Sequence, residues 1–281
     1  MKNIAYYIGK VGLIEEMTVP MNDRACYFGD GVYDAAIAVN HVPLHFDDHI
    51  DRIYRSAKMI GIDIPMEKAE MKRTIQGLVD QVEGDELFVY WQVTRGVGMR
   101  NHPFKGAETG PSLWAWVRPA KMRDVNGAYR CVTTEDKRFY YCNIKTINLL
   151  PAVLANQKAE EAGCDETIFH RGERVTECSH SNVHIIKDGV LKTAPCDELI
   201  LPGITRAHIL EICQRAGVPV VEEPFTLDEL FDADEVFFSS SSAVTSRVCS
   251  IDGKAVGMKD EKTFALIRDT YQEDIHLECR G

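Results

Sequence analysis

The sequence lacks long hydrophobic runs, and this absence excludes membrane-spanning proteins. Its longest apolar stretches, Leu87–Trp91 and Leu113–Val117, are far shorter than the roughly 18 residues that indicate a transmembrane helix. Lys10 and the Glu15-Glu16 pair interrupt the N-terminal segment before an apolar core could form, so no export signal is expected. We therefore expect a cytosolic protein.

Closely spaced cysteines are also missing. The nine cysteines are odd in number, scattered, and free of Cys-x-x-Cys spacing. This pattern argues against a zinc site and against a disulfide framework. We expect reduced, mostly buried thiols and no metal.

The sequence has no run of Lys and Arg, and acidic residues exceed basic ones by 43 to 32, which gives a net charge of −11. Such a chain repels phosphate backbones and anionic lipids, so neither nucleic acid nor a membrane surface is an expected partner. With 281 residues, 45% of them hydrophobic, the chain is that of an ordinary globular protein. A prior of roughly 150 residues per domain favours two modest domains or one large one.

Periodicity divides the chain into two parts of different character. Residues 1–119 combine early short strands with two helices and two buried strands, which is typical of an α+β or mixed α/β domain. A polar segment at 120–127, with Pro before it and Gly at its end, is the predicted linker. Residues 128–281 form the predicted larger, strand-rich domain. In the first part, the predicted helices span 47–60 and 67–82 and the predicted strands 87–94 and 112–118.

In the second part, Asp188-Gly189 is a strong signal for a hairpin between two strands. A proline in its first turn and Gly163 after its end bound one predicted helix. Gly203-Ile204-Thr205 opens a second helix, which ends at Gly217. The predicted strands span 129–134, 166–170, 182–187, 190–193 and 235–238, and the first helix spans 151–162.

Two segments are suited to bind an anion. The helix start at Gly203-Ile204-Thr205 offers unpaired N–H groups, and the four serines at 239–242 follow a predicted buried strand. Together they could hold one phosphate. An ordinary capped helix and a polar loop explain the same residues.

Lys145 lies in the mostly apolar and aromatic segment 140–150, where a lysine is out of place if it serves only solubility. A desolvated amine is a nucleophile toward carbonyl groups, as a Schiff-base lysine must be. A lysine that extends from a strand end toward solvent is the alternative. Glu177, which follows the turn at 171–173, gives no assignment by itself.

Five segments, in this order along the chain, resemble the fold-type IV aminotransferases that use pyridoxal phosphate. The resemblance spans about Tyr27 to Ser242, and five ordered motifs are far more specific than any one of them. The segments are Tyr27-Phe28-Gly29-Asp30-Gly31-Val32-Tyr33, His49-Ile50-Asp51-Arg52-Ile53-Tyr54, Lys145 with its neighbours, Glu177-x-Ser179-x-Ser181-Asn182-Val183, and Gly203-Ile204-Thr205-Arg206.

The resemblance implies a two-domain fold with the cofactor, pyridoxal 5'-phosphate, between the domains. It implies that Lys145 forms the Schiff base with the cofactor and moves the substrate proton, and that Glu177 binds the pyridine nitrogen. Arg52 would hold the phosphate, although periodicity alone places it opposite the apolar stripe of its helix, on a solvated face. The remaining cofactor-binding residues that the resemblance implies are Leu201, Ile204, Thr205 and Ser241.

Arg100-Asn101-His102 resembles the Arg-x-His signature of the D-amino acid aminotransferases, and Tyr33 is also in place. The resemblance implies a trap for the substrate carboxylate, built from Tyr33 of one subunit and from Arg100 and His102 of its neighbour. The implied activity is amino transfer between a D-amino acid, such as D-alanine or D-glutamate, and a 2-oxo acid. A shared site requires a homodimer. A solvated loop is the alternative for Arg100 and His102.

Cys178 and His180 depart from the small residues that the subfamily commonly has around Glu177. If His180 points toward the substrate, it could narrow the range of side chains accepted or add a pH dependence. Cofactor affinity is the property that these changes put in doubt. Relatives with other activities remain as alternatives: a branched-chain L-amino acid aminotransferase, an (R)-amine transaminase, an aminodeoxychorismate lyase, and a non-enzymatic member.

Overall fold

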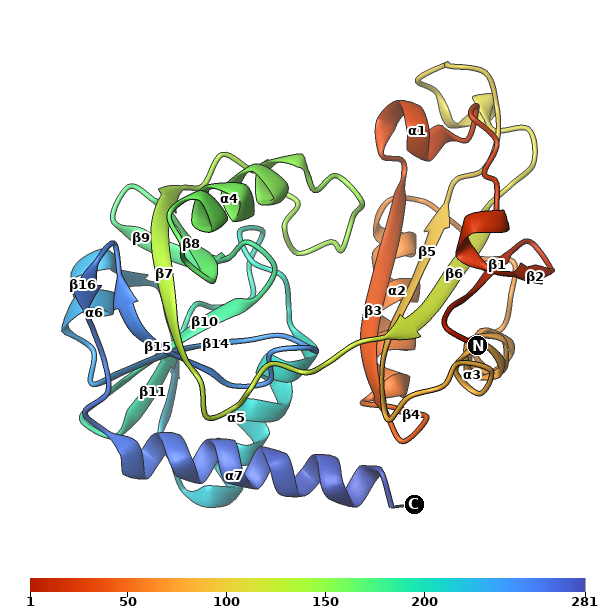
Figure 1. Cartoon of the computed structure of the whole chain (residues 1–281). Helices are drawn as coiled ribbons and strands as arrows, with labels where there is room; N and C mark the ends of the chain where they lie inside the picture. The colour runs from red at the N-terminus through yellow and green to blue at the C-terminus, as the bar shows by residue number, and fades with distance from the viewer. Residues whose placement is uncertain (281) are drawn as a thin grey trace. The chain divides into compact units, whose positions relative to one another are not determined.

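The computed structural model describes residues 1–280 and divides the chain into two compact units (Figure 1). The first unit comprises Met1–Met122 and Ile144–Asn148, and the second comprises Arg123–Asn143 and the described chain from Leu149 onward. The chain thus passes from one unit to the other within the segment predicted as a linker, and a short segment around Lys145 then joins the first unit. The domain boundaries at 119 and 128 stay a prediction.

The first unit is built on a six-stranded antiparallel sheet in the order β2-β1-β6-β5-β3-β4, against which helices α2 and α3 pack. Its strands are β1 (Ile4–Tyr7), β2 (Lys10–Gly12), β3 (Gly31–Val39), β4 (Val42–Pro43), β5 (Glu86–Thr94) and β6 (Ser112–Pro119). Its helices are α1 (Arg24–Phe28), α2 (Phe46–Met59) and α3 (Lys68–Val79), with 3-10 turns η1 (Ile14–Glu16) and η2 (Phe104–Gly106).

The predicted apolar stripe of α2 explains its packing. Ile50, Ile53 and Ala57 are buried in the core of the first unit, while Asp47 in the first turn and Lys58 in the last complement the helix dipole. The two helices and two strands predicted for this part of the chain are confirmed, with ends that differ by at most three residues.

The second unit contains a ten-stranded mixed sheet in the order β12-β11-β10-β14-β15-β7-β8-β9-β13, with β16 paired to β15. The strands are β7 (Ala128–Glu135), β8 (Glu166–Arg171), β9 (Arg174–Cys178), β10 (Asn182–Lys187), β11 (Val190–Thr193), β12 (Val220–Glu222), β13 (Phe225–Thr226), β14 (Glu235–Ser239), β15 (Ser246–Ile251) and β16 (Lys254–Ala255). The helices are α4 (Leu150–Glu161), α5 (Ile204–Ala216), α6 (Leu227–Asp232) and α7 (Glu261–Glu278).

Local signals in the second unit act as predicted. Lys187 pairs with Val190 across the Asp188-Gly189 turn, which confirms the hairpin. Helix α5 ends at Gly217, whose φ of 71° lies in the left-handed region that glycine adopts without strain. Helix α7 was not predicted, although its buried residues follow a helical spacing: Phe264, Ile267, Tyr271 and Ile275.

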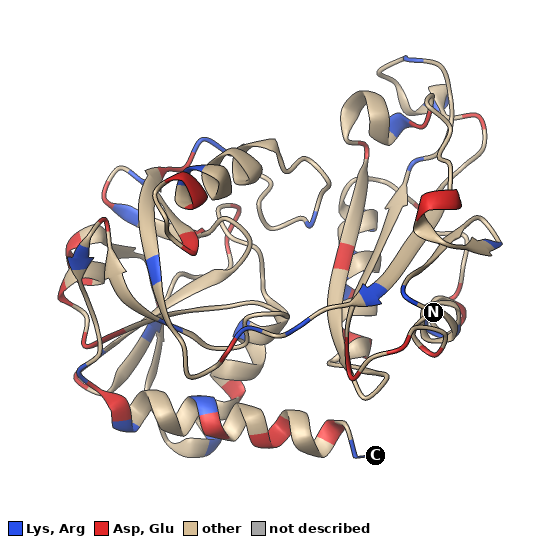
Figure 2. Ribbon diagram, in the orientation of Figure 1, with Lys and Arg blue, Asp and Glu red and all other residues tan. Residues whose placement is uncertain are grey.

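The surface agrees only in part with the expectations from composition. Lys and Arg are interspersed with Asp and Glu over both units (Figure 2). No helix within residues 1–280 is long and apolar enough to cross a membrane. All nine cysteines are free, but only Cys131, Cys178 and Cys213 are buried, so the expectation of mostly buried thiols is wrong. The exposed Cys26 lies in a short helix and the exposed Cys196 in a loop. Amino-acid composition alone does not show that these positions are exposed.

Buried His184 makes stability depend on pH. Burial, assisted by the positive charge of Arg206, lowers the pKa of His184 from 6.5 to about 3. Between those values the unfolded chain binds a proton that the folded chain does not, so the free energy of unfolding falls by about 1.4 kcal/mol per unit as pH decreases. We expect the free energy of unfolding, measured by urea titration, to fall between pH 7.5 and pH 5.0 by about 2 kcal/mol more in the wild type than in His184→Gln. Equal losses in both proteins would contradict this role of His184.

Candidate active site

The segment that carries Lys145 is held against the start of β3. The N–H of Tyr33 donates to the Lys145 carbonyl over 2.9 Å, and the N–H of Ile147 donates to the Gly31 carbonyl over 3.2 Å. The Asn148 side chain donates to the Gly29 carbonyl over 2.8 Å. Gly29 is required at that point, because its φ is +61° and a Cβ would lie 2.6 Å from the amide oxygen of Asn148.

The amine of Lys145 faces Tyr33. Its Nζ lies 3.3 Å from the Tyr33 hydroxyl and 4.3 Å from the centre of the ring. Lys145 is half-buried, and no carboxylate of residues 1–280 forms an ion pair with it. A carboxylate partner would stabilise the protonated amine, which is not a nucleophile. Without such a partner, the amine of Lys145 is suited to react with a carbonyl group.

Arg52 is buried, so the prediction that it lies on a solvated helix face is wrong. Its Nε and Nη2 donate to the two carboxylate oxygens of Asp34 over 2.8 and 2.6 Å. Asp34 also contacts Nδ1 of His49 at 2.7 Å. Helical periodicity could not reveal the pairing because Asp34 lies on β3, and the carboxylate there makes burial of an arginine favourable.

The charges in this cluster are well defined. Burial alone would raise the pKa of Asp34, but Arg52 and His49 outweigh it and hold that pKa well below its ordinary value. Burial lowers the pKa of His49, and the charges of Arg52 and Lys145 act in the same direction. Nη1 of Arg52 has no hydrogen bond to any described residue, so a fixed, positively charged donor remains for an anion.

Arg100 and His102 lie together in an exposed loop. The Phe28 ring lies 5.2 Å from the His102 ring and 5.4 Å from the Arg100 guanidinium. Buried Arg24 supports the loop by donating to the carbonyls of Asn101 and His102 over 2.5 and 3.2 Å. The structure therefore brings this predicted pair together and leaves both side chains accessible.

In the second unit, three donors hold the carboxylate of buried Glu177. Nη1 of Arg138 donates to Oε1 over 2.5 Å, while the N–H of Leu201 and Nδ2 of Asn182 donate to Oε2 over 3.0 and 3.1 Å. Burial raises the pKa of Glu177, and the guanidinium of Arg138 opposes that rise. Asp136 fixes Arg138 by accepting from its Nε and Nη2, both at 2.9 Å.

The two predicted anion-binding segments are also in the second unit. Helix α5 begins after Gly203 without a side-chain cap, and the N–H groups of Ile204 and Thr205 donate to no acceptor in the described chain. In the turn after β14, the Ser240 hydroxyl is buried without a partner among residues 1–280, and Ser241 is half-buried beside it. The N–H groups of Ile204 and Thr205 and the Ser240 hydroxyl are therefore donors that an anion could accept from.

Cys178 and His180, the two unusual residues near Glu177, have surroundings that explain how each is accommodated. Nδ1 of His180 lies 3.1 Å from Oε2 of Glu166 and 2.9 Å from the hydroxyl of Ser179, while the ring stays half-exposed. Cys178 is buried, and burial raises the pKa of its thiol well above the ordinary value. A buried, protonated thiol is a weak nucleophile, so Cys178 is poorly suited to react.

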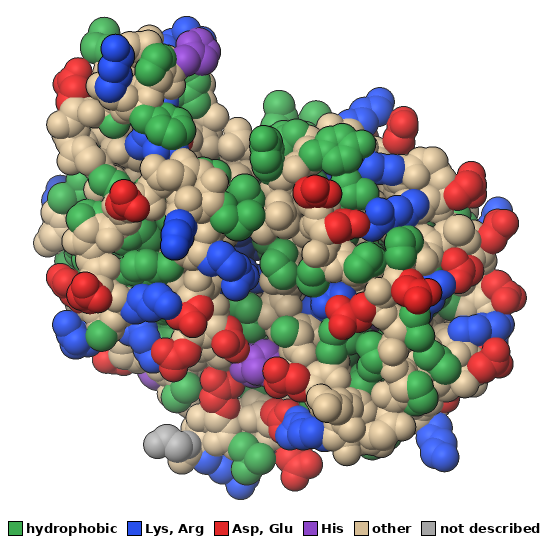
Figure 3. Space-filling view, turned by 180° about the vertical axis from the view of Figure 1, so that it is seen from behind, with side chains coloured by type: hydrophobic (Ala, Val, Ile, Leu, Met, Phe, Trp, Pro, Cys, Tyr) green, Lys and Arg blue, Asp and Glu red, His purple; other side chains and the backbone are tan. Residues whose placement is uncertain are grey.

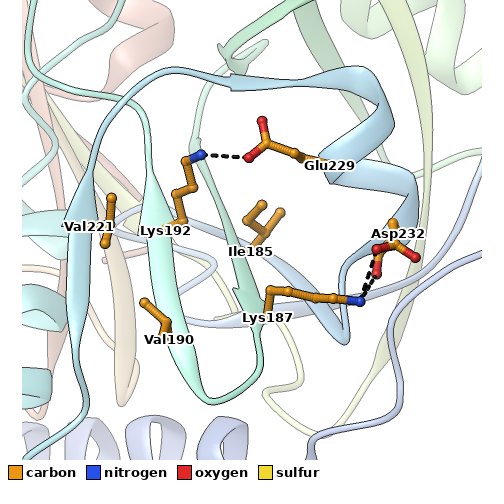
Figure 4. A pocket seen from close by; sticks show the side chains of 7 residues that line it. All are labelled: Ile185, Lys187, Val190, Lys192, Val221, Glu229 and Asp232. Carbon is orange, nitrogen blue, oxygen red and sulfur yellow. Dashed lines mark hydrogen bonds and ion pairs between the residues drawn. The ribbon is translucent and has the colours of Figure 1, made fainter.

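A pocket of about 190 Å³ lies in the second unit between strands β10 to β12 and helix α6 (Figure 4). Its two lysines are already paired: Lys192 with Glu229 at 2.6 Å, and Lys187 with Asp232 at 3.0 Å. None of the predicted site residues lines it. This pocket is therefore separate from the candidate site.

Three residues that support the predicted ones were not predicted from the sequence. Asp34, Arg138 and Asn182 each contact a predicted site residue, but none was assigned a role. One signal was present in the sequence. A buried Glu177 needs a positively charged partner, and Arg138, which is followed by three aromatic residues, was a candidate for it. Which arginine supplies that charge depends on contacts between distant parts of the chain.

Residues 31–251 match the family "Amino-transferase class IV". A D-alanine aminotransferase of Listeria monocytogenes is 43% identical over 273 residues, which are 94% of this chain and 93% of that protein. A protein of the same name from Bacillus licheniformis is 40% identical over 86% of both chains.

Solved structures give the same fold. A branched-chain aminotransferase from Thermoproteus uzoniensis has a TM-score of 0.89 and 25% identity, covering 98% of this chain and 95% of its own. One from Escherichia coli has a TM-score of 0.86 and 20% identity, covering 97% and 94% of the two chains. The expected α+β fold of fold-type IV is therefore confirmed. The chain belongs to the class IV aminotransferases, enzymes that depend on pyridoxal 5'-phosphate.

Proposed function

We propose that the protein transfers an amino group between a D-amino acid, such as D-alanine or D-glutamate, and a 2-oxo acid. The observation that carries the proposal is the pair Arg100 and His102, which gather on Phe28 without a carboxylate partner in residues 1–280. A guanidinium and an imidazole on one exposed loop suit an α-carboxylate. Relatives that are 40–43% identical and named D-alanine aminotransferase support the same activity.

Each unit, taken by itself, holds residues that fit a part of pyridoxal phosphate. In the first unit, Lys145 offers an amine that no carboxylate neutralises, and Arg52 has a free Nη1. In the second unit, the uncapped start of α5 and the unpartnered hydroxyl of Ser240 suit the phosphate. Leu201 contributes its N–H to the carboxylate of Glu177.

When bound, pyridoxal phosphate supplies an aldehyde that links to the amino group and a ring that withdraws electrons from the substrate Cα. Glu177 would keep the ring nitrogen protonated, and its two oxygens are held by donors that favour the charged carboxylate. Nζ of Lys145 would take the proton from the substrate Cα, and the Tyr33 hydroxyl at 3.3 Å orients that nitrogen.

The substrate trap requires a second subunit in this proposal. Within one chain Tyr33 contacts Lys145 and Tyr90, whereas Arg100 and His102 contact Phe28. We infer that Tyr33 acts with Arg100 and His102 of the partner subunit. Together they would hold the substrate carboxylate so that the Cα hydrogen of a D-amino acid faces Lys145.

An apolar surface on the second unit supports the homodimer. In Figure 3, hydrophobic side chains gather at the end of this unit where α4 lies. Leu150, Val153 and Leu154 of α4 are 58–68% exposed, and Tyr140 and Tyr141 are also exposed. Large contiguous apolar patches mark interaction sites. We expect a species of twice the chain mass of 31.6 kDa in sedimentation equilibrium.

We also propose a cytosolic location, because all nine cysteines are free thiols and a reducing compartment preserves such thiols. The physiological substrates are small amino and 2-oxo acids rather than nucleic acid or lipid, in keeping with the net charge of −11.

The proposal is tested by steady-state assays of the purified enzyme with 2-oxoglutarate as acceptor. We expect turnover with D-alanine and little with L-leucine or L-valine. The opposite preference would favour a branched-chain enzyme, to which the solved structures are similar in fold. Activity on (R)-amines with no activity on D-alanine would indicate an (R)-amine transaminase. Release of pyruvate from aminodeoxychorismate without a 2-oxo acid acceptor would indicate an aminodeoxychorismate lyase.

A further inference from the structure

Asn182 occupies a central place beside the carboxylate of Glu177. It is the first residue of β10 and is 5% exposed. Its Nδ2 donates to Oε2 of Glu177 over 3.1 Å and to the carbonyl of Leu201 over 3.0 Å. One amide group therefore joins the carboxylate to the loop that precedes α5.

The chemistry of the two partners fixes the orientation of this amide. A carboxylate oxygen and a carbonyl oxygen only accept hydrogen bonds, so the NH₂ group must face both of them. Both of its hydrogens are then used. Aspartate has the same shape but offers only acceptors at this position, so it cannot replace asparagine without repulsion from Glu177.

The surrounding backbone approaches Asn182 closely. A Cβ on Gly203 would lie 2.0 Å from the amide oxygen of Asn182, so only glycine permits this approach. In the sheet, Asn182 pairs with Ser239, the last residue of β14 before the serine turn. Its backbone is fixed by β14 and its side chain by Leu201 and Gly203.

We propose that Asn182 is a positioning residue, which holds Oε2 of Glu177 in place by tying it to the carbonyl of Leu201. The inference rests on the proposed binding of pyridoxal phosphate. Arg138 already supplies the positive charge at Oε1, so Asn182 adds direction rather than charge. The N–H of Leu201 also donates to Oε2, so without Asn182 this oxygen would keep one donor of two, and the carboxylate would be oriented less tightly toward the pyridine nitrogen.

The test is a double-mutant cycle on the apo-protein, read out as the Kd for pyridoxal 5'-phosphate. A hydrogen bond to a charged group is strong enough that Asn182→Ala should raise this Kd about tenfold. In a Glu177→Gln background the same change should raise it less than about twofold, because Asn182 acts through Glu177. Equal effects in both backgrounds would contradict the proposal.

Inorganic phosphate serves as a second probe, since neither Glu177 nor Asn182 is among the donors proposed for the phosphate. Its Kd should be unchanged in Asn182→Ala, whereas a general loss of structure would weaken it as well. Asn182→Asp fills the same space but removes both donors and adds a charge beside Glu177, so it is a second, independent variant to be measured beside the alanine variant. It should weaken pyridoxal phosphate at least as strongly, and wild-type affinity in this variant would overturn the inference.

The exposed Asn126 provides the matched control, and Asn126→Asp should leave both Kd values unchanged. Failure of the inference is distinguishable from failure of the proposed function. If Glu177→Gln alone leaves the Kd for pyridoxal phosphate unchanged, the assignment of Glu177 is wrong. If Glu177→Gln weakens binding but neither Asn182 variant does, only the role of Asn182 is wrong.

Discussion

Replacing Lys145 with alanine is expected to lower kcat for transamination by about a thousandfold or more, because one substitution removes both the nucleophilic amine and the proton-transferring group. The fold should persist. The segment 144–148 is held by backbone hydrogen bonds to β3, and the side chain of Lys145 contributes only its contact with Tyr33. Steady-state rates with D-alanine, together with thermal unfolding by circular dichroism, measure both effects.

The matched control is Lys262→Ala, which removes an exposed lysine of α7 and should leave kcat unchanged. A folded Lys145→Ala protein that turns over D-alanine at the wild-type rate would overturn the assignment of Lys145.

Arg100→Ala is expected to raise KM for D-alanine about 10- to 100-fold, which corresponds to the loss of a charge-assisted hydrogen bond to the substrate carboxylate. The absorption of the bound cofactor should not change, because Arg100 is exposed and contacts only the Phe28 ring within the described chain. Arg118 is also exposed and lies 5.6 Å from the Trp116 ring, so Arg118→Ala is a close control. An unchanged KM in Arg100→Ala would count against the carboxylate trap.

Mixing the Lys145→Ala and Arg100→Ala variants, assayed at a D-alanine concentration well below the raised KM of Arg100→Ala, tests whether Arg100 acts across subunits. In a heterodimer of Lys145→Ala and Arg100→Ala, one of the two sites has an intact Lys145 together with an intact Arg100 of the partner subunit. Random exchange of subunits should therefore restore about one quarter of the wild-type sites. If activity does not return after exchange, Arg100 and Lys145 of the same chain form the site.

Local patterns were sufficient for the elements that carry the site. The stripe of Ile50, Ile53 and Ala57 predicted α2, and the Asp188-Gly189 turn predicted the β10–β11 hairpin, because both depend on neighbouring residues. The ordered motifs were sufficient for the family. The return of 144–148 to the first unit was not predictable from local sequence, since hydrogen bonds to β3 determine it.

Arg52 shows the limit of periodicity most clearly. Its position on the helix predicts solvent exposure, yet it is buried because Asp34, which lies 18 positions earlier on β3, neutralises it. Arg138 was missed for the same reason, since its partner Glu177 lies 39 positions away. Asn182 is only five positions from Glu177, but its second partner, Leu201, lies 19 positions away. Polar networks of this kind depend on tertiary contacts, which no local pattern contains.

The central claim is that Lys145, Glu177 and the Arg100–His102 pair perform pyridoxal phosphate chemistry on D-amino acids. The most direct test is the absorption spectrum of the purified holoenzyme before and after addition of D-alanine and, separately, of L-alanine or L-leucine. We expect a yellow protein whose absorption band shifts to that of the pyridoxamine form with the D-amino acid alone. A shift with the L-amino acid alone would contradict the substrate assignment, and a protein that stays colourless with added pyridoxal phosphate would contradict the whole account.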